Sequence, residues 1–432
     1  MPTRRHVVTG LGAAGLAAAG DAFAWLDPAA VGGVRERFAT APAGAAAAGD
    51  EALWREVQQA FRVDRTLVNL NNGGVSPAPA VVQDAMARYL AYSNEAPVQT
   101  MWRVLEPQKE GVRAQLARHF GCDAEELALT RNASEGLQIC QFGFDLERGD
   151  EVLTTDQDYP RMLNTFRQRE RREGVKLVTF PIPVPAEDPE EIVRRYAERI
   201  TPRTKLILVS HVINRTGQVM PVREVVALGR SRGIPVIVDG AHAFAQFPFS
   251  NADLDCDYYA TSLHKWLFAP FGTGFLYVRR ERIEGLWPLM ASRPGQDADI
   301  RKFEEIGTHP APNYLAVGAA LAFHEGLGVE RKAARLRHLR DLWADALRGE
   351  DRIRFHSSFR PEFGCGLANV AIDGIEPRAL ADWLWTRHRI LVSPIGHADC
   401  TGIRVTPSVY TTLSELDRFV AAMRTAARSG IA

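Results

Sequence analysis

Two short segments carry the residues of this chain that are best suited to chemistry. Lys265 follows a short apolar run and is preceded by Ser262 and His264, and Asp239 closes the nearly continuous apolar run 234–238. A lysine and an aspartate at the ends of two buried strands favour pyridoxal phosphate (PLP) chemistry. The lysine would hold the cofactor aldehyde as a Schiff base, and the aspartate would keep the pyridine nitrogen protonated so that the ring accepts electrons. Both would lie at the carboxyl ends of strands, where open α/β sheets bind ligands.

Three further positions, each after an expected strand, offer contacts to such a cofactor. Asn132, Ala133 and Ser134 begin a helix whose free backbone N–H groups can hold a phosphate, although ordinary helix capping explains Asn132 and Ser134 equally well. Tyr159 can lie over the pyridine ring or can be a core tyrosine after a capped turn. Asn214 can hydrogen-bond the phenol oxygen of the cofactor or the carboxylate of a substrate.

The remaining polar candidates complete this expected site. Ser262 and His264 can donate hydrogen bonds to the phosphate, and together with Lys265 and Asp239 they favour a Schiff-base site over unrelated surface charges. Arg404 lies on an expected C-terminal strand and can bind an α-carboxylate through two N–H groups, which a lysine cannot match. A surface salt bridge is the alternative interpretation of Arg404.

The elements that must position these residues are short β-rich runs that alternate with longer helical patterns. The runs contain Val, Ile and Leu without alternation, so we expect helices to bury both faces of a mostly parallel sheet. The expected strands are residues 126–130, 151–155, 176–180, 205–210, 235–239, 258–262 and 273–278. The helices between them include residues 158–173, 187–200 and 222–232. The pattern predicts an α/β fold with a seven-stranded sheet.

A smaller α+β domain is expected at the C-terminal end. An amphipathic pattern over about residues 314–347 predicts a long helix that connects to it. Ser414, followed by Glu415 and Asp417, favours the start of the last helix by capping and by dipole complementarity. The expected strands here are residues 367–372 and 402–406, and the expected helices are residues 378–387 and 413–428.

The N-terminus is typical of an export signal. Arg4 and Arg5 precede an apolar run at residues 11–19 and an Ala-x-Ala cleavage site at residues 22–24. The paired arginines resemble the twin-arginine signal, although Val7 stands where Phe is commonest. A basic tail is the alternative. Because the twin-arginine machinery exports folded proteins, this pathway suits an enzyme that captures its cofactor in the cytoplasm.

These patterns divide the chain into six consecutive parts. They are a signal peptide (1–24), a flexible leader (25–50), a segment bordering the site (51–75), a large cofactor-binding domain (76–312), a connecting helix (313–345) and a small C-terminal domain (346–432).

Composition argues against several other classes of protein. Lys and Arg together number 52, as do Asp and Glu, so no basic field favours nucleic acid. The body contains no apolar run of 18 residues, so we expect no membrane-spanning segment in the mature protein. The five cysteines lack paired spacing, so neither a disulfide framework nor a metal site is expected. They are Cys122, Cys140, Cys256, Cys365 and Cys400.

Taken together, these motifs resemble the class V aminotransferase family of PLP fold type I, and most of all its isopenicillin N epimerase and cysteine desulfurase branch. The resemblance covers about residues 65–425 and is specific for fold and cofactor, but not for substrate. The motifs that carry it are Asn132-Ala133-Ser134, His211 to Asn214, Asp239 to His242, Ser262 to Lys265, Gly307-Thr308 and Arg404.

The resemblance implies a role for each matching residue. Lys265 would bind the cofactor and shuttle protons, Asp239 would contact the pyridine nitrogen and Tyr159 would stack on the ring. The implied phosphate ligands are Ala133, Ser134, Ser262 and His264, with Asn214 and His242 near the ring oxygen. Arg404 and Asn214 would bind the substrate carboxylate, and the segment Asn71, Asn72 and Gly73 would border the substrate. It also implies a homodimer in which Gly307 and Thr308 reach the partner's phosphate.

The expected function is therefore that of an exported PLP enzyme acting on the amino group or Cα of an amino acid or an amino-acid-containing metabolite. Epimerisation, transamination and a tailoring reaction stay open, with His397 or Tyr410 as candidates for a second acid. A C–S lyase or a desulfurase-like enzyme is an alternative. The desulfurase is disfavoured because Cys400 lies only four residues before Arg404, too close to swing as a persulfide carrier. A non-catalytic ligand-binding protein and a lysine Schiff-base enzyme without PLP are the remaining alternatives.

Overall fold

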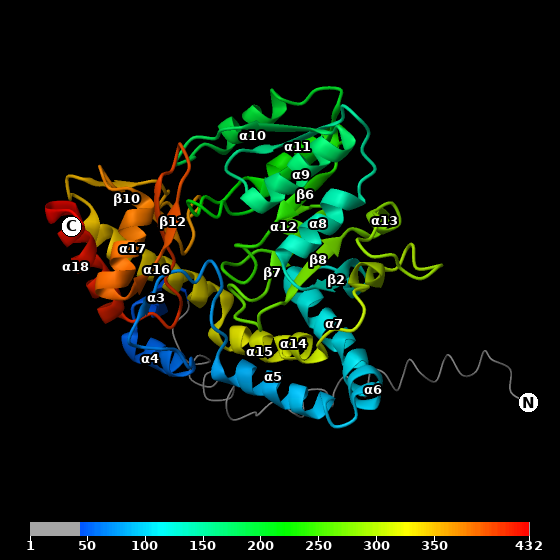
Figure 1. Ribbon diagram of the computed structural model, residues 1–432, viewed down its shortest axis with the longest axis horizontal. Helices are drawn as coiled ribbons and strands as arrows, with labels where there is room; N and C mark the ends of the chain where they lie inside the picture. Colours follow the sequence, from blue (N-terminus) through cyan, green and yellow to red (C-terminus); the bar gives the residue numbers. More distant parts are fainter. Residues whose placement is uncertain (1–43, 432) are drawn as a thin grey trace, which may run out of the picture.

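The computed structural model describes residues 44–431, which form a large α/β domain and a smaller C-terminal domain (Figure 1). The expected signal peptide and most of the expected leader lie outside the described residues. The domain boundaries drawn from the sequence stay predictions.

The large domain is built on a seven-stranded sheet with the strand order β2-β8-β7-β6-β5-β3-β4. Only β8 runs antiparallel to its neighbours, so the expected mostly parallel sheet is confirmed. Its strands are β2 (Leu127–Thr130), β3 (Glu151–Thr155), β4 (Lys176–Phe180), β5 (Thr204–Ser210), β6 (Val236–Asp239), β7 (Tyr258–Ser262) and β8 (Gly274–Val278).

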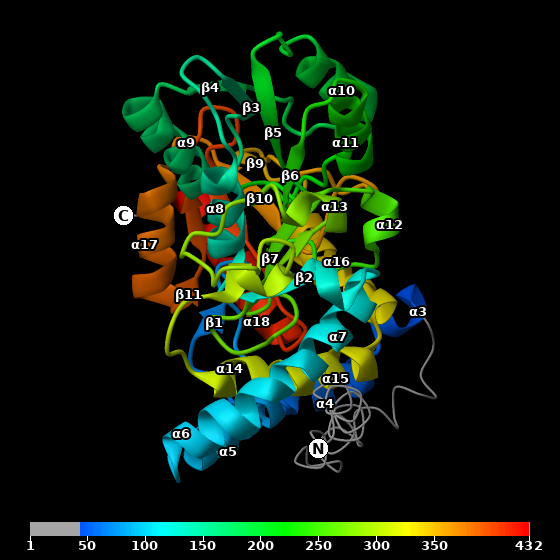
Figure 2. The same ribbon diagram turned by 90° about the vertical axis from the view of Figure 1, so that its right-hand side faces the viewer.

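Helices cover both faces of this sheet (Figures 1 and 2). Alternate residues of β5 enter different cores: Leu206 and Leu208 pack with α8 and α9, whereas Ile207 and Val209 pack with α7, α10 and α11. This burial on both sides explains the continuous apolar runs in the sequence. The bounds are α7 (Lys109–Phe120), α8 (Ala133–Gly143), α9 (Pro160–Glu173), α10 (Pro189–Ala197), α11 (Val222–Ser231), α12 (Asn251–Leu254) and α13 (Arg280–Ile283).

The C-terminal domain contains a four-stranded antiparallel sheet with the order β12-β13-β10-β9. A separate two-stranded parallel pair joins β1, near the N-terminus, to β11 of this domain, with Val68 opposite Ile390. The elements are β1 (Val68–Asn69), β9 (Ile353–Phe355), β10 (Ala368–Ile372), β11 (Ile390–Leu391), β12 (Ser393–Ile395), β13 (Gly402–Val405), α17 (Pro377–His388) and α18 (Leu413–Ser429).

The single connecting helix expected from the amphipathic pattern is instead three helices: α14 (Ala311–Leu315), α15 (Val317–Leu327) and α16 (Val329–Leu347). The last break falls at Gly328, whose φ of 77° lies in the left-handed region that glycine adopts without strain. The cap expected at Ser414 is also wrong. Thr412 caps α18, since its hydroxyl accepts from the Glu415 N–H at 3.2 Å and its own N–H donates to the Glu415 carboxylate at 2.7 Å.

The described part of the N-terminal region is helical. α3 (Ala45–Ala48) and α4 (Glu51–Gln59) lie beside α16, and the Trp54 indole donates to the Ala47 carbonyl at 2.8 Å. The expected flexibility of the leader therefore does not extend to these residues. Further along, α5 (Ala80–Ser93), α6 (Pro97–Gln99) and a π-helical turn at Thr100–Leu105 precede α7. Among the described residues, no helix has the length and apolar character needed to cross a membrane.

Candidate active site

A polar cavity lies at the carboxyl ends of the sheet strands. It brings together most of the site residues expected from the sequence, although these come from the ends of five different strands. The cavity lining includes Asn132, Ala133, Ser134, Tyr159, Asn214, Asp239, His242, Ser262, His264 and Lys265.

Asp239 is the last residue of β6 and is 6% exposed. One of its carboxylate oxygens accepts from the Ala241 N–H at 3.0 Å, which fixes the side chain at the strand end. Burial raises the pKa of Asp239 to about 6, with the hydrogen bond from Ala241 and the charge of Lys265 acting in the opposite direction. A cationic group placed beside this buried carboxylate would stabilise its charged form.

Lys265 follows β7, and its Nζ lies 3.0 Å from His242 Nε2. Burial lowers the pKa of Lys265 to about 8; Asp239 opposes this shift, and Arg404 adds to it. Burial also lowers the pKa of His242 well below its usual value, so the imidazole is neutral and its Nε2 can accept from the ammonium form of Lys265. The cavity therefore holds a lysine whose amine is far easier to deprotonate than one in water.

The N-terminus of α8 forms another wall of the cavity. Asn132 caps this helix by accepting from the Glu135 N–H at 2.9 Å. The Ala133 N–H donates to the Ser262 hydroxyl at 2.9 Å, so it already has a partner within the protein. Ser134 also lines the cavity. Ala133 therefore links the helix start to the end of β7, which aligns the group of donors expected to bind the phosphate.

Arg404 lies on β13, where it faces the large domain from the C-terminal domain. It is 6% exposed and donates to the Asn214 carbonyl at 3.0 Å and to the Asn71 side chain at 2.9 Å. Burial lowers the pKa of Arg404 to about 10. Since Asn214 lines the cavity, its hydrogen bond with Arg404 places the guanidinium next to the cavity. This position suits an anchor for a substrate carboxylate.

The two neighbouring asparagines have different environments. Asn71 contacts Arg404, whereas the Asn72 amide donates to the backbone carbonyls of Asn69 and Thr406 at 2.9 and 3.0 Å. The Asn72 side-chain oxygen accepts from the Tyr410 hydroxyl at 2.6 Å. Asn72 thus holds the N-terminal segment against the C-terminal domain, and the structure places Asn71 rather than Asn72 beside the expected substrate anchor.

Sequence reasoning did not single out Asp158, which joins the ends of two strands beside the cavity. This buried carboxylate accepts from Thr154 and Thr155 on β3 and from the Ser210 backbone and hydroxyl on β5. It therefore ties two strand ends together directly before Tyr159. The signal was an aspartate next to the expected aromatic residue, but its partner Ser210, on the other strand, is 52 positions away in the sequence.

The cavity residues fit the expected cofactor. Three buried atoms of lining residues have no hydrogen-bond partner: His242 Nδ1, Asn214 Oδ1 and His264 Nδ1. Arg404 Nε, beside the cavity, has none either. Because buried polar groups are costly when unpaired, such a set favours a polar ligand. Asp239 suits a pyridinium, Lys265 an aldehyde, and the α8 start with Ser262 a phosphate.

Several expected residues lie outside this cavity. Gly307 and Thr308 line a separate polar cavity with Lys109, Arg301 and His309. Their expected contact with a partner subunit stays a prediction. Tyr410 does not line the cavity, since its hydroxyl binds Asn69 and Asn72.

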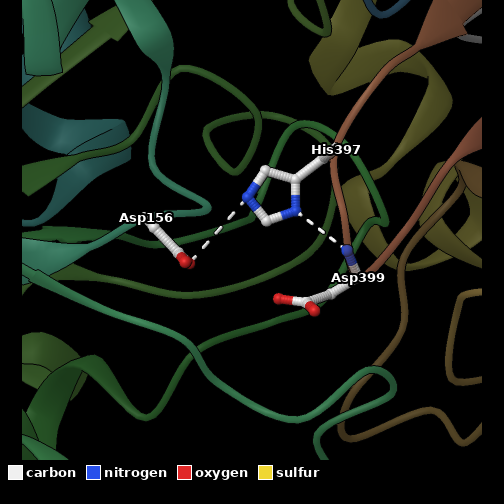
Figure 3. Close-up of side chains that lie close together, drawn as sticks. All are labelled: Asp156, His397 and Asp399. Atoms are coloured by element: carbon white, nitrogen blue, oxygen red, sulfur yellow. Dashed lines mark hydrogen bonds and ion pairs between the residues drawn. The ribbon is translucent and has the colours of Figure 1, made fainter.

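His397 belongs to a cluster with Asp156 and Asp399 at the junction of the domains (Figure 3). Its Nε2 lies 3.9 Å from Asp156 Oδ1, and its Nδ1 accepts from the Asp399 N–H at 3.3 Å. His397 does not line the Lys265 cavity, so the structure does not place it as the second acid. The side chain of Asp156 is 36% exposed, and the ligand atoms of the cluster lie within 4.8 Å of one another, an arrangement that exposed acidic groups commonly adopt without a metal ion.

All five cysteines are free thiols in the described part of the chain. Cys400 is fully buried, and burial raises the pKa of its thiol to about 11. A buried thiol with a raised pKa is a poor nucleophile. This environment agrees with the sequence argument against Cys400 as a mobile sulfur carrier.

Comparison with known proteins relates this site to characterised chemistry. The isopenicillin N epimerase of Streptomyces clavuligerus is 30% identical over 387 residues, which cover 86% of this chain and 97% of that protein. A probable cysteine desulfurase of Vibrio cholerae is 25% identical over 386 residues, covering 83% of this chain and 93% of the relative. A solved complex of the cystine C–S lyase C-DES with its product cysteine persulfide is 25% identical, with a TM-score of 0.74, and covers 83% of this chain and 98% of that one.

The family model described as aminotransferase class-V matches residues 68–419, a range that contains every element of the cavity. The cavity residues and this match lead to the same assignment. The chain belongs to the aminotransferase class-V family.

Proposed function

We propose that this protein is an exported PLP-dependent enzyme that transfers a proton at Cα of an amino acid or an amino-acid-containing metabolite. The observation that carries the proposal is the pairing of Lys265 with His242 at 3.0 Å in a cavity that Asp239 also lines. Among the possible reactions we favour epimerisation, since the isopenicillin N epimerase of Streptomyces clavuligerus is similar over nearly its whole length.

PLP is the cofactor, as expected from the sequence. When bound, it supplies an electron-accepting ring that stabilises negative charge at Cα of a bound amine. Asp239 would hold the pyridine nitrogen in its protonated form, because a cation relieves the cost of the buried carboxylate. The donors at the start of α8, with Ser262 and His264, would bind the phosphate end.

Lys265 would move the proton at Cα. Its pKa of about 8 leaves a useful fraction of the amine unprotonated near neutral pH, so Nζ can accept a proton. The neutral His242 ring accepts a hydrogen bond from Nζ when that nitrogen is protonated. Arg404 would hold the substrate carboxylate and so orient Cα toward Nζ.

A C–S lyase reaction is the second candidate, favoured by the similarity to the cystine C–S lyase C-DES. It needs the same proton removal and then loss of a sulfur group from the neighbouring carbon. A desulfurase that uses Cys400 as sulfur carrier is disfavoured because that thiol is buried. Transamination shares the first step with both reactions. All of them use Lys265.

The test is proton exchange at Cα in D₂O, followed by ¹H NMR and chiral chromatography, with a panel of L- and D-amino acids and small peptides. Epimerisation predicts deuterium at Cα together with the opposite enantiomer. Pyruvate or sulfide release would instead identify a lyase, and conversion to a keto acid an aminotransferase. Lys265→Ala should abolish exchange, whereas the buried Lys302→Met, outside the cavity, should retain it. Exchange that survives Lys265→Ala would contradict the proposal.

Export and dimerisation are parts of the same proposal. Cleavage near residue 24 and transport by the twin-arginine machinery are tested by fractionation of cells that produce the full chain, with Arg4→Lys/Arg5→Lys as the control. A cytoplasmic, uncleaved product would contradict export. A homodimer should elute at twice the chain mass in size-exclusion chromatography with light scattering.

A further inference from the structure

Lys332, on α16, is a fully buried lysine that has no role in the site described above. Its Nζ donates to the backbone carbonyl of Trp266, lies 3.3 Å from His324 Nδ1 and sits 4.1 Å from the centre of the Phe268 ring. No ion pair joins it to any carboxylate among residues 44–431. Burial therefore lowers the pKa of Lys332 well below its usual value.

Two of the three contacts of Lys332, those with Trp266 and Phe268, fall on the segment directly after Lys265. Trp266 and Phe268 are both buried, and Phe268 has a φ of 62°. A bulky aromatic residue in the left-handed region is a rare, strained conformation that persists only where its surroundings hold it. Lys332 contacts both the ring of this strained residue and the carbonyl of Trp266, two residues before it.

Trp266 also lies near the histidine that faces the Lys265 amine. Its ring lies 6.4 Å, centre to centre, from the ring of His242, which in turn lies 3.0 Å from Lys265 Nζ. A shift of Trp266 would therefore move both the backbone that carries Lys265 and the imidazole that faces its amine. Displacements near 1 Å at a reacting group are enough to reduce rates about 100-fold.

We propose that Lys332 is a positioning residue for Lys265, holding residues 266–268 in the strained conformation that aims the Lys265 amine at its partners in the cavity. The proposal rests on the PLP function assigned to Lys265. A buried lysine without a carboxylate partner is unfavourable for stability, whereas a methionine of similar length would fill this space at lower cost. A methionine could fill the space but could not donate to the Trp266 carbonyl, so this hydrogen bond explains the lysine where packing does not.

Lys302 provides a matched control within the same chain. It is 3% exposed, donates to the backbone carbonyls of Ile283 and Asp297 at 2.6 and 2.8 Å, and lies 5.1 Å from the centre of the Phe303 ring. It thus has the same kinds of contacts as Lys332, but on a segment that does not line the Lys265 cavity. Lys302→Met measures what the loss of a buried lysine does to stability alone.

The experiment compares Lys332→Met with Lys302→Met in the full-length protein. The readouts are the pH midpoint of the absorbance change of the lysine-bound cofactor, the rate of PLP capture by cofactor-free protein, and the Tm of that protein. We expect Lys332→Met to shift the midpoint by about one pH unit and to slow capture about tenfold or more, which a displaced amine would cause. Lys302→Met should keep the wild-type midpoint and capture rate, whatever its effect on Tm. Equal midpoints and capture rates in the two variants would overturn the proposal.

A second variant covers the case in which Lys332→Met does not fold. His324→Gln removes a contact of Lys332 but leaves Trp266 and Phe268 in place. His324→Gln should shift the pH midpoint in the same direction as Lys332→Met does, but by a smaller amount. An unchanged midpoint would overturn the proposal. Wild-type protein that fails to bind PLP at all would contradict the cofactor instead, so the two failures can be told apart.

Discussion

Capture of PLP by the cofactor-free protein should follow deprotonation of Lys265, with a midpoint near pH 8 rather than above pH 10. The free amine attacks the cofactor aldehyde, so the rate depends on the fraction of Lys265 that is unprotonated. Burial lowers the pKa of Lys265 from 10.5 to about 8. At pH 7 this change raises the free-amine fraction from roughly 1 in 3,000 to roughly 1 in 10, a gain of about 300-fold, equivalent to about 3 kcal/mol.

Two substitutions should move this midpoint in opposite directions. Asp239 raises the pKa of Lys265 and Arg404 lowers it. Asp239→Asn should therefore shift the midpoint to lower pH, and Arg404→Gln should shift it to higher pH. Lys265→Ala should give no absorbance band for the lysine-bound cofactor at any pH.

The assay is stopped-flow absorbance after PLP is mixed with cofactor-free protein between pH 6 and pH 10. Rates should rise with pH and level off above the midpoint. A rate that still increases tenfold per pH unit at pH 10 would mean that Lys265 titrates like a lysine in water. Equal shifts from the two substitutions would likewise refute the assigned charge contacts.

Four further predictions concern stability, the helix start and the cysteine. The folded-state pKa of Lys265 is lowered, so the folded protein binds fewer protons than the unfolded chain between about pH 8 and 10.5. The Tm of the wild type should therefore rise with pH in this range, relative to the Tm of Lys265→Met. For Asp239 the folded-state pKa is raised, so Tm should fall as pH rises from about 4 to 6, and Asp239→Asn should remove this slope. A Cβ on Gly274 would lie 2.7 Å from Asn132 Cα, so Gly274→Ala should displace the start of α8. Equilibrium dialysis should then show PLP binding weakened about tenfold or more. Unchanged binding would contradict this prediction. Cys400→Ser should retain the activity of the wild type, and its loss in a folded variant would revive the desulfurase alternative.

Local sequence patterns were sufficient for the central sheet and the main site. Asp239 ends one apolar strand and Lys265 closely follows another, and a parallel sheet brings such strand ends to one edge regardless of the loops between them. The helix break at Gly328 and the cap at Thr412 were within reach of local signals as well, since both use residue types with known preferences. At these two places Gly328 and Thr412 are stronger signals than the amphipathic periodicity and Ser414.

The sequence by itself determined the sheet, the family and the residues of the cofactor cavity, because strand burial and strand-end chemistry are local properties. Only the tertiary structure decided that Asn71 rather than Asn72 faces Arg404, that β1 pairs with β11, and that Lys332 contacts the segment after Lys265. Each of these contacts joins residues separated by many positions in the chain. Their geometry depends on how the two domains and the N-terminal segment pack, which no local pattern of residue types encodes.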